Sequence, residues 1–134
     1  DDLDKLIIIL KENMIKSIKL PVSAPFHCSL MNKATQIMSK ELNELNFTQS
    51  ENKLISNVTA KEILSTDELK DLLIKQIENR VRWRESVINM INGGVKHFIE
   101  IGPGKVLSGL VKRINREVKI DTINNQEDIK NLKI

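Results

Sequence analysis

The sequence predicts an α/β fold, because short apolar strands alternate with amphipathic helices along the chain. The clearest unit lies towards the C-terminus, where a strand over 95–101 (VKHFIEI) precedes a glycine turn. A helix over 105–114 and a second strand over 118–123 follow it. Strands that are separated by a helix favour parallel pairing, so we expect a sheet with parallel strands.

Helical periodicity accounts for most of the chain before that unit. In the segment 29–45, apolar residues recur at steps of three and four and so share one face of a helix. Ser65 precedes Thr66-Asp67-Glu68, which is a capped start for a helix over 67–78. A helix over 82–91 ends at Gly93-Gly94, since glycine adopts left-handed backbone angles at little cost.

The remaining elements are shorter. A helix is predicted over 3–15, an extended piece over 17–22, a strand over 53–58 and a last helix over 127–132. Pro21 and Pro25 mark a loop and the one plausible boundary between subdomains. In the helix 105–114 we expect the apolar residues to be buried: Val106, Leu107, Leu110, Val111 and Ile114.

Composition excludes several classes of protein. Of the 134 residues, 40% are hydrophobic and 29% charged, which suits one globular domain or part of one. The apolar run 6–10 is far shorter than the roughly 20 residues of a membrane-spanning helix, so no membrane is expected. The single cysteine, Cys28, excludes an internal disulfide and argues against a metal site, and it fits a reducing, cytoplasmic location.

The charge balance does not point to nucleic acid. Net charge is +3, and a chain with three Phe, one Trp and no Tyr offers few rings for base stacking. We therefore expect no nucleic-acid partner. The chain begins at Asp1 and enters a helical pattern at once, so we expect a fragment of a longer protein.

His27 is the first candidate for chemistry. It lies in the segment LPVSAPFHCSLM (20–31), in a loop bounded by two prolines immediately before a helix. An imidazole that titrates near neutral pH can accept and return a proton, and this loop would fix its position. The alternative is a surface or helix-capping histidine, and spacing alone does not decide between them.

Two further segments could contribute. If the helix 67–78 ends near Asn79, the backbone carbonyl of Gln76 has no partner within the helix. Such a carbonyl could accept Nδ1–H of an imidazole, fix the tautomer and leave Nε2 as the base, in place of a triad aspartate; otherwise Gln76 merely ends a helix. Gly102-x-Gly104 before a helix could cradle phosphate, but it lacks the rest of either nucleotide fingerprint, and a tight turn is the better reading. His97 is interpreted as structural or as a surface residue.

Taken in order, these segments resemble the malonyl-CoA:acyl-carrier-protein transacylases of bacterial fatty-acid synthesis. The resemblance covers nearly the whole chain and includes PVSxPxHCxLM, SNV, LLxxQIxNxVxW, GGV and EIGPGKVLSGLVKRI. It implies the C-terminal part of a two-subdomain enzyme with an α/β-hydrolase-like core and an inserted ferredoxin-like subdomain. Residues 1–22 would end the insertion, and residues 23–134 would belong to the core.

The resemblance also implies roles for individual residues. His27 would be the general base and acid, and the carbonyl of Gln76 would orient it. Asn57 and Val58 would lie near the substrate pocket. Phe26 replaces the small residue often found before the histidine, and its ring would crowd an α-methyl group, which favours malonyl over methylmalonyl. No cofactor is implied beyond the coenzyme A thioester substrate, malonyl-CoA, and the implied protein partner is acyl carrier protein.

The chain lacks several parts of such an enzyme. It contains no G-x-S-x-G elbow to supply the serine nucleophile, and neither the oxyanion loop nor the malonate-binding arginine of the family is present. We therefore expect this chain to be inactive without the missing N-terminal half. The alternative function is a non-catalytic module that binds acyl carrier protein through Lys112, Arg113 and Arg116, although these cations also suit a solvated helix end.

Overall fold

The computed structural model describes residues 1–19 and 21–132. Leu20, which belongs to the predicted extended piece and to the histidine segment, lies outside the described residues, as do positions 133 and 134 of the predicted core subdomain. The helices and strands are α1 (Asp2–Glu12), the 3-10 helix η1 (Ser29–Met31), α2 (Asn32–Glu44), α3 (Thr66–Lys75), α4 (Trp83–Asn92), β1 (His97–Ile101), α5 (Val106–Ile114), β2 (Lys119–Ile123) and α6 (Gln126–Asn131).

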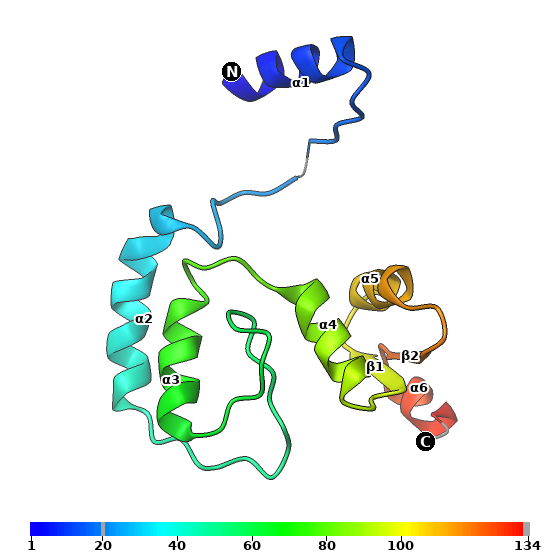
Figure 1. Cartoon of the computed structure of the whole chain (residues 1–134). Coiled ribbons are helices and arrows are strands. Elements are labelled where there is room, and N and C mark those ends of the chain that lie inside the picture. Colours follow the sequence, from blue (N-terminus) through cyan, green and yellow to red (C-terminus); the bar gives the residue numbers. More distant parts are fainter. Residues whose placement is uncertain (20, 133–134) are drawn as a thin grey trace.

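The two strands form a parallel pair, as the sequence predicts. Their register runs from His97 opposite Lys119 to Ile101 opposite Ile123. The connection through α5 packs back on both strands, α4 packs on α5, and α6 packs on β2. Figure 1 shows these helices and strands together as one α/β unit in the C-terminal part of the chain. The predicted α/β class and the parallel pairing are therefore confirmed.

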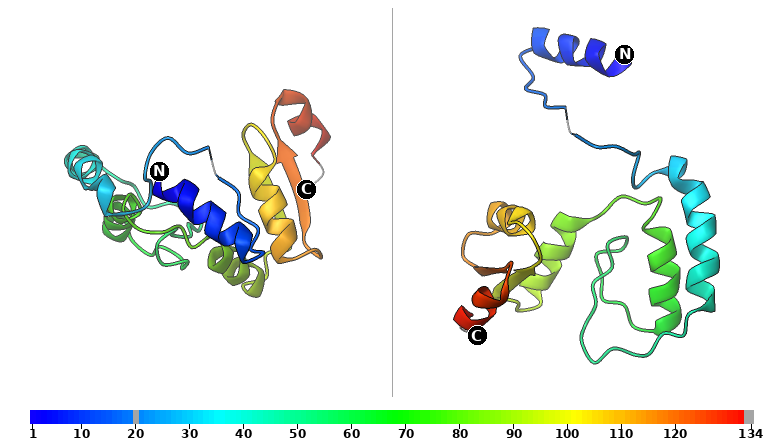
Figure 2. Two further views of the ribbon diagram at one scale, coloured as in Figure 1. Left: turned by 90° about the horizontal axis from the view of Figure 1, so that it is seen from above. Right: turned by 180° about the vertical axis from the view of Figure 1, so that it is seen from behind.

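A second group of elements precedes this α/β unit in the sequence. Helices α2 and α3 pack side by side, and both views in Figure 2 keep them adjacent. Helix α1 stands apart from both groups and packs on no other helix or strand within the described part of the chain. The residues that follow it return along it, where Lys19 Nζ lies 3.2 Å from Asp4 Oδ1.

Helix ends are set by local hydrogen bonds. The Ser65 hydroxyl accepts the Glu68 N–H at 3.1 Å, and the Glu68 carboxylate accepts the Leu64 N–H at 2.8 Å, so the predicted capped start of α3 is confirmed. α1 ends earlier than predicted. Asn13 donates its side-chain amide to the Ile9 carbonyl at 2.8 Å, and Met14 has a φ of 58°, which stops the helix.

The predicted strand over 53–58 is wrong. Instead, Ile55 and Glu62 make a single antiparallel bridge, and the chain between them folds into a tight turn. The N–H of Ser56 donates to the Lys61 carbonyl, and the N–H of Ala60 donates to the Ser56 carbonyl, both at 2.9 Å. Backbone groups that bond within their own turn leave no ladder for a neighbouring strand, so no sheet extends here.

The fully buried core is small, and much apolar surface is exposed. The buried hydrophobic residues of the core are Ala60, Leu72, Val87 and Val111. Val106 and Leu107 are 72% and 42% exposed, so their predicted burial is wrong. Periodicity shows which residues share a helix face, not whether another element covers that face. Large exposed apolar side chains continue around the chain, among them Ile18, Leu30, Leu64 and Ile101.

Within the described residues, no helix is long and apolar enough to cross a bilayer.

Candidate active site

His27 sits at the bend that leads into η1, with a left-handed φ of 61°. Short contacts order the bend: the Cys28 thiol donates to the Pro25 carbonyl at 3.1 Å, and the Phe26 N–H donates to the Ala24 carbonyl at 2.9 Å. His27 Nδ1 lies 2.9 Å from the backbone carbonyl oxygen of Gln76. Because a carbonyl can only accept, Nδ1 carries the proton, and in the neutral ring Nε2 is then the nitrogen with the lone pair.

Gln76 is the C-cap residue that directly follows α3. Its own N–H still donates to Leu72, but the turn that follows bonds back to other carbonyls. Ile77 donates to the Ile74 carbonyl, and both Glu78 and Asn79 donate to the Lys75 carbonyl. The Gln76 carbonyl is thereby left to accept from the imidazole. α3 itself ends at Lys75, earlier than the predicted end near Asn79, because residues 77–79 bond back as turns.

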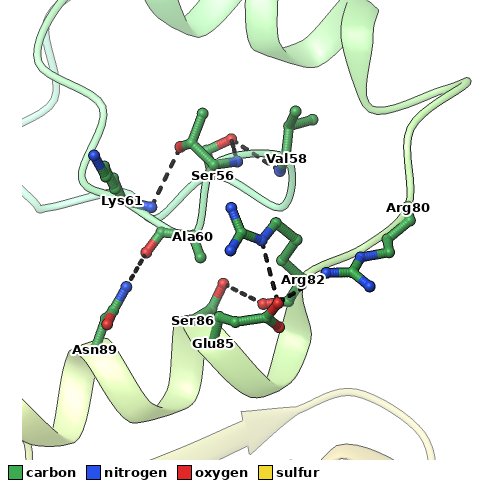
Figure 3. Close-up of polar contacts among 10 residues, drawn as sticks. Ser56, Val58, Ala60, Lys61, Arg80, Arg82, Glu85, Ser86 and Asn89 are labelled. Atoms are coloured by element: carbon green, nitrogen blue, oxygen red, sulfur yellow. Dashed lines mark hydrogen bonds and ion pairs between the residues drawn. The ribbon is translucent and has the colours of Figure 1, made fainter.

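Asn57 joins the same cluster from the turn 56–61. Its side-chain amide donates to Gln76 Oε1 at 3.0 Å, and its backbone carbonyl accepts the Arg82 N–H at 2.8 Å. Figure 3 shows this turn held against α4, where the Asn89 amide donates to the Ala60 carbonyl at 2.8 Å. The structure thus brings together three of the predicted site residues, His27, Gln76 and Asn57.

Phe26 and Val58 lie beside this cluster without a hydrogen bond to it in the described part of the chain. The Phe26 side chain is 58% exposed. The Val58 N–H donates to the Ser56 hydroxyl at 3.1 Å, inside the turn shown in Figure 3. The structure therefore gives the positions of both residues, and their predicted substrate contacts stay predictions.

A hollow of about 250 Å³ opens between the turn and α3. Asn57 and Gln76 contribute polar groups to it, and most of its other lining is apolar, including Leu69, Leu72 and Leu73. His27 does not line this hollow and is itself exposed. The imidazole therefore faces the surface, where a reacting group from outside the described residues could reach Nε2.

Comparison with known proteins gives this cluster a context. No family model matches the chain. It is 42% identical over 122 residues to the malonyl CoA-acyl carrier protein transacylase of Bacillus subtilis (strain 168), covering 90% of this chain and 38% of the relative. The enzyme of the same name from Staphylococcus aureus (strain MSSA476) is 41% identical over 111 residues, or 83% of this chain and 36% of the relative. This chain is homologous to part of the malonyl CoA-acyl carrier protein transacylases.

Solved structures agree with that assignment. The malonyl CoA-acyl carrier protein transacylase of Clostridium perfringens ATCC 13124 superimposes with a TM-score of 0.85 at 38% identity, covering 96% of this chain and 41% of that one. A malonyl-transacylase solved in complex with a type II PKS acyl-carrier protein gives 0.85 at 31% identity, covering 96% of this chain and 42% of that one. The predicted resemblance is confirmed, and the chain spans less than half the length of the transacylases that it matches.

The glycine turn of this transacylase homologue is not a free phosphate cradle. The N–H groups of Leu107 and Ser108, in the first turn of α5, donate to the Glu100 carboxylate at 3.1 and 2.7 Å. The Gly104 N–H donates to Asn124 Oδ1 at 2.7 Å. The donors that would bind phosphate are already used by the protein itself, which argues against the nucleotide-binding alternative.

The Glu100 cap makes the stability of α5 depend on pH. Hydrogen bonds from Ser108, and then from the Leu107 N–H, hold the pKa of Glu100 below its ordinary value of 4.5. A carboxylate whose folded pKa is lowered stabilises the fold above its unfolded pKa, and this contribution is lost as pH falls through the folded pKa. We expect Glu100→Gln to lower the urea midpoint at pH 7 and to lose most of that difference near pH 3.

The matched control is Glu117→Gln, because Glu117 is an exposed carboxylate with its backbone N–H, not its side chain, in a hydrogen bond to Asn115. Urea titrations of both variants at the two pH values, followed by far-UV circular dichroism, measure the effect. An equal difference for Glu100→Gln at pH 7 and pH 3 would show that the ionised cap contributes nothing.

His97 is structural, as predicted. Its Nε2 lies 2.7 Å from Asp121 Oδ2 across the two strands, and this contact is the main cause of the lowered pKa of Asp121. Among residues 1–19 and 21–132, no group of three or more His, Cys, Asp or Glu side chains could hold a metal ion.

Sequence reasoning missed two features of the site. One is the Glu100 cap, for which a carboxylate within an apolar strand that ends at a helix start is a usable signal. The other is the amide bridge from Asn57 to Gln76, whose partners are 19 residues apart. No local sequence pattern predicts that hydrogen bond.

Proposed function

We propose that this chain is one part of a malonyl transacylase of fatty-acid biosynthesis, acting in the cytoplasm. Joined with the remainder of such an enzyme, it would move a malonyl group from coenzyme A to acyl carrier protein through an acyl-serine intermediate. The observation that carries the proposal is the 2.9 Å contact between His27 Nδ1 and the Gln76 carbonyl, because it leaves Nε2 as an exposed base. Homology to named transacylases supplies the reaction class.

His27 would serve both half-reactions with the same nitrogen. Nε2 takes the proton of the serine hydroxyl as the serine oxygen attacks the malonyl thioester carbonyl, and the imidazolium returns it to the departing coenzyme A sulfur. In the second half-reaction, Nε2 takes the proton of the carrier's pantetheine thiol. That thiol attacks the acyl-serine, and the proton returns to the serine oxygen. The Gln76 carbonyl stabilises the imidazolium in each step, as an aspartate does in a triad.

The division of the chain follows from the same proposal. Residues 1–22 would end a ferredoxin-like insertion, and residues 23–134 would complete an α/β-hydrolase-like core. The isolation of α1 from every other described helix and strand supports a boundary after it. The apolar residues of α1, such as Leu6 and Ile9, are about half exposed, which is the condition expected of a helix whose subdomain lies elsewhere.

Substrate selection is proposed for Phe26, Asn57 and Val58. Phe26 directly precedes His27 and has an exposed ring, so a substrate that approaches Nε2 would pass it. The ring would crowd an α-methyl group and favour malonyl over methylmalonyl. One methyl group is usually worth about 1–3 kcal/mol of discrimination. Coenzyme A enters only as the thioester substrate, with no additional cofactor.

Acyl carrier protein is the proposed partner, and the complex of a related malonyl-transacylase with its carrier supports it. A second candidate is a non-catalytic module that binds the carrier alone. The exposed cations Lys112 and Arg113 in the last turn of α5 favour it, since complementary charge would steer an acidic carrier. The two candidates differ in one respect: only the first requires a serine nucleophile.

Complementation separates the two candidates. The chain is co-expressed with the part of the Bacillus subtilis relative that it does not match, and malonyl transfer from malonyl-CoA to holo acyl carrier protein is measured. We expect transfer from the pair and none from either part alone, because the base and the nucleophile then lie in one site. Carrier binding by the chain without transfer by the complementary pair would support the module instead.

A further inference from the structure

Gln76 makes hydrogen bonds in two directions at the end of α3. Its backbone carbonyl accepts from His27 Nδ1 at 2.9 Å, and its side-chain oxygen accepts from the Asn57 amide at 3.0 Å. One residue therefore links the imidazole to a side chain on a different segment. The two partners come from 49 residues before Gln76 and from 19 residues before it.

Asn57 is itself firmly held. Its carbonyl accepts the Arg82 N–H at 2.8 Å, which fixes it to the start of α4. The neighbouring Ser56 is only 4% exposed, and its hydroxyl accepts the Val58 N–H at 3.1 Å. Figure 3 shows the turn fastened to α4 again through Ala60 and Asn89. The Asn57 amide is thus presented from a turn that is tied at several points.

Gln76 needs such support because it ends a helix. The last turn of a helix frays more readily than its middle, and a carbonyl there can reorient. His27 is exposed, so burial adds little to hold its imidazole against this carbonyl. On the other side, the Asn32 amide donates to Glu78 at 3.2 Å, so the ends of two segments are joined near the imidazole.

We infer that Asn57 is a positioning residue for His27: it acts through the Gln76 side chain to hold the Gln76 carbonyl where it fixes the Nδ1–H tautomer. For Asn57 this role is the alternative to the substrate contact proposed above from the family resemblance, and it rests on the proposed function of His27 as the base. A substrate contact would change KM. A positioning contact changes kcat and the tautomer of the ring.

A double-mutant cycle on the 134-residue chain tests the inference without an activity assay. Asn57→Ala and Gln76→Ala remove the amide bridge from either side, and Gln76→Ala keeps the backbone carbonyl. In nitrogen NMR of histidine-labelled protein, each variant is expected to reduce the Nδ1–H tautomer of His27, and the double variant should show no further reduction. Asn43→Ala is the matched control, because Asn43 is exposed on α2 and its amide reaches only Ser39, at 3.5 Å.

Two results would overturn the inference: an unchanged tautomer in Asn57→Ala, or independent reductions that multiply in the double variant. His97 serves as an internal reference in the same spectra, since its partner Asp121 is untouched by the substitutions. A shift of the His97 signals would reveal general unfolding, and Gln76→Ala then supplies the second, independent route to breaking the bridge.

The same variants in the complemented enzyme give the kinetic readout. We expect kcat to fall roughly three- to tenfold, the effect of one neutral hydrogen bond, with KM unchanged. A rise in KM at constant kcat would assign Asn57 to substrate binding instead. If His27→Ala leaves transfer intact, the proposed function fails, while the NMR cycle still decides whether Asn57 controls the imidazole.

Discussion

Replacing His27 by alanine is expected to lower malonyl transfer by the complemented enzyme roughly 10²–10⁴-fold, the usual contribution of a positioned general base. The imidazole is the group whose Nδ1 is bound to the Gln76 carbonyl at 2.9 Å and whose Nε2 is left to take a proton. Without it, the serine hydroxyl and the carrier thiol must lose their protons to water. The rate of transfer to holo acyl carrier protein at saturating malonyl-CoA measures the loss.

Two controls accompany this experiment. His97→Ala removes the other histidine, which bonds to Asp121 across the strands, and should keep nearly full activity. His27→Asn retains an N–H donor for the Gln76 carbonyl but no base, so it should be as inactive as alanine. Activity in His27→Asn, or an equal loss in His97→Ala, would contradict the assignment of the base.

Aspartate at Val87 is expected to abolish cooperative folding of the chain. Val87 is 0% exposed and lies on the inner stripe of α4, so a carboxylate there would be buried without a partner. Burying an unpaired charge costs several kcal/mol or shifts its protonation, which approaches the roughly 5–15 kcal/mol total stability of an ordinary domain. Urea titration followed by circular dichroism should show no transition, or one at much lower urea.

Val106→Asp is the matched control for that substitution. Val106 is 72% exposed in the first turn of α5, where an acidic side chain suits the helix dipole. The control should therefore unfold at nearly the wild-type urea concentration. A native-like transition in Val87→Asp would mean that α4 does not depend on burial of this stripe.

The exposed apolar surface connects the two experiments. Residues such as Leu30 and Ile101, at 75% and 78% exposed, leave the hydrophobic faces of several elements uncovered. Relatives are more than twice as long as the stretch that they share with this chain. In the proposed enzyme the remaining part would cover these faces and bring the serine to His27, so folding, assembly and activity would improve together on complementation.

Local patterns were sufficient for much of the fold. Three signals each act over a few residues and can therefore be recognised in the sequence: the apolar periodicities, the Ser65 cap and the glycine pair after α4. The same holds for the free carbonyl at the end of α3, which a helix end guarantees wherever it occurs. That carbonyl left its partner open, and the family resemblance supplied the prediction that the partner is His27.

What the sequence alone determined, then, was the set of helices and the parallel strand pair, whereas the pairing of an imidazole with a helix end was predicted through the family resemblance. Only the tertiary structure decided that a turn over 56–61 interrupts the predicted strand, that Val106 and Leu107 stay uncovered, that Glu100 caps α5 and that Asn57 bonds to Gln76. The physical reason is separation in the sequence. Burial and side-chain hydrogen bonds between distant residues depend on which groups come into contact after folding, and no short stretch of residues specifies those contacts.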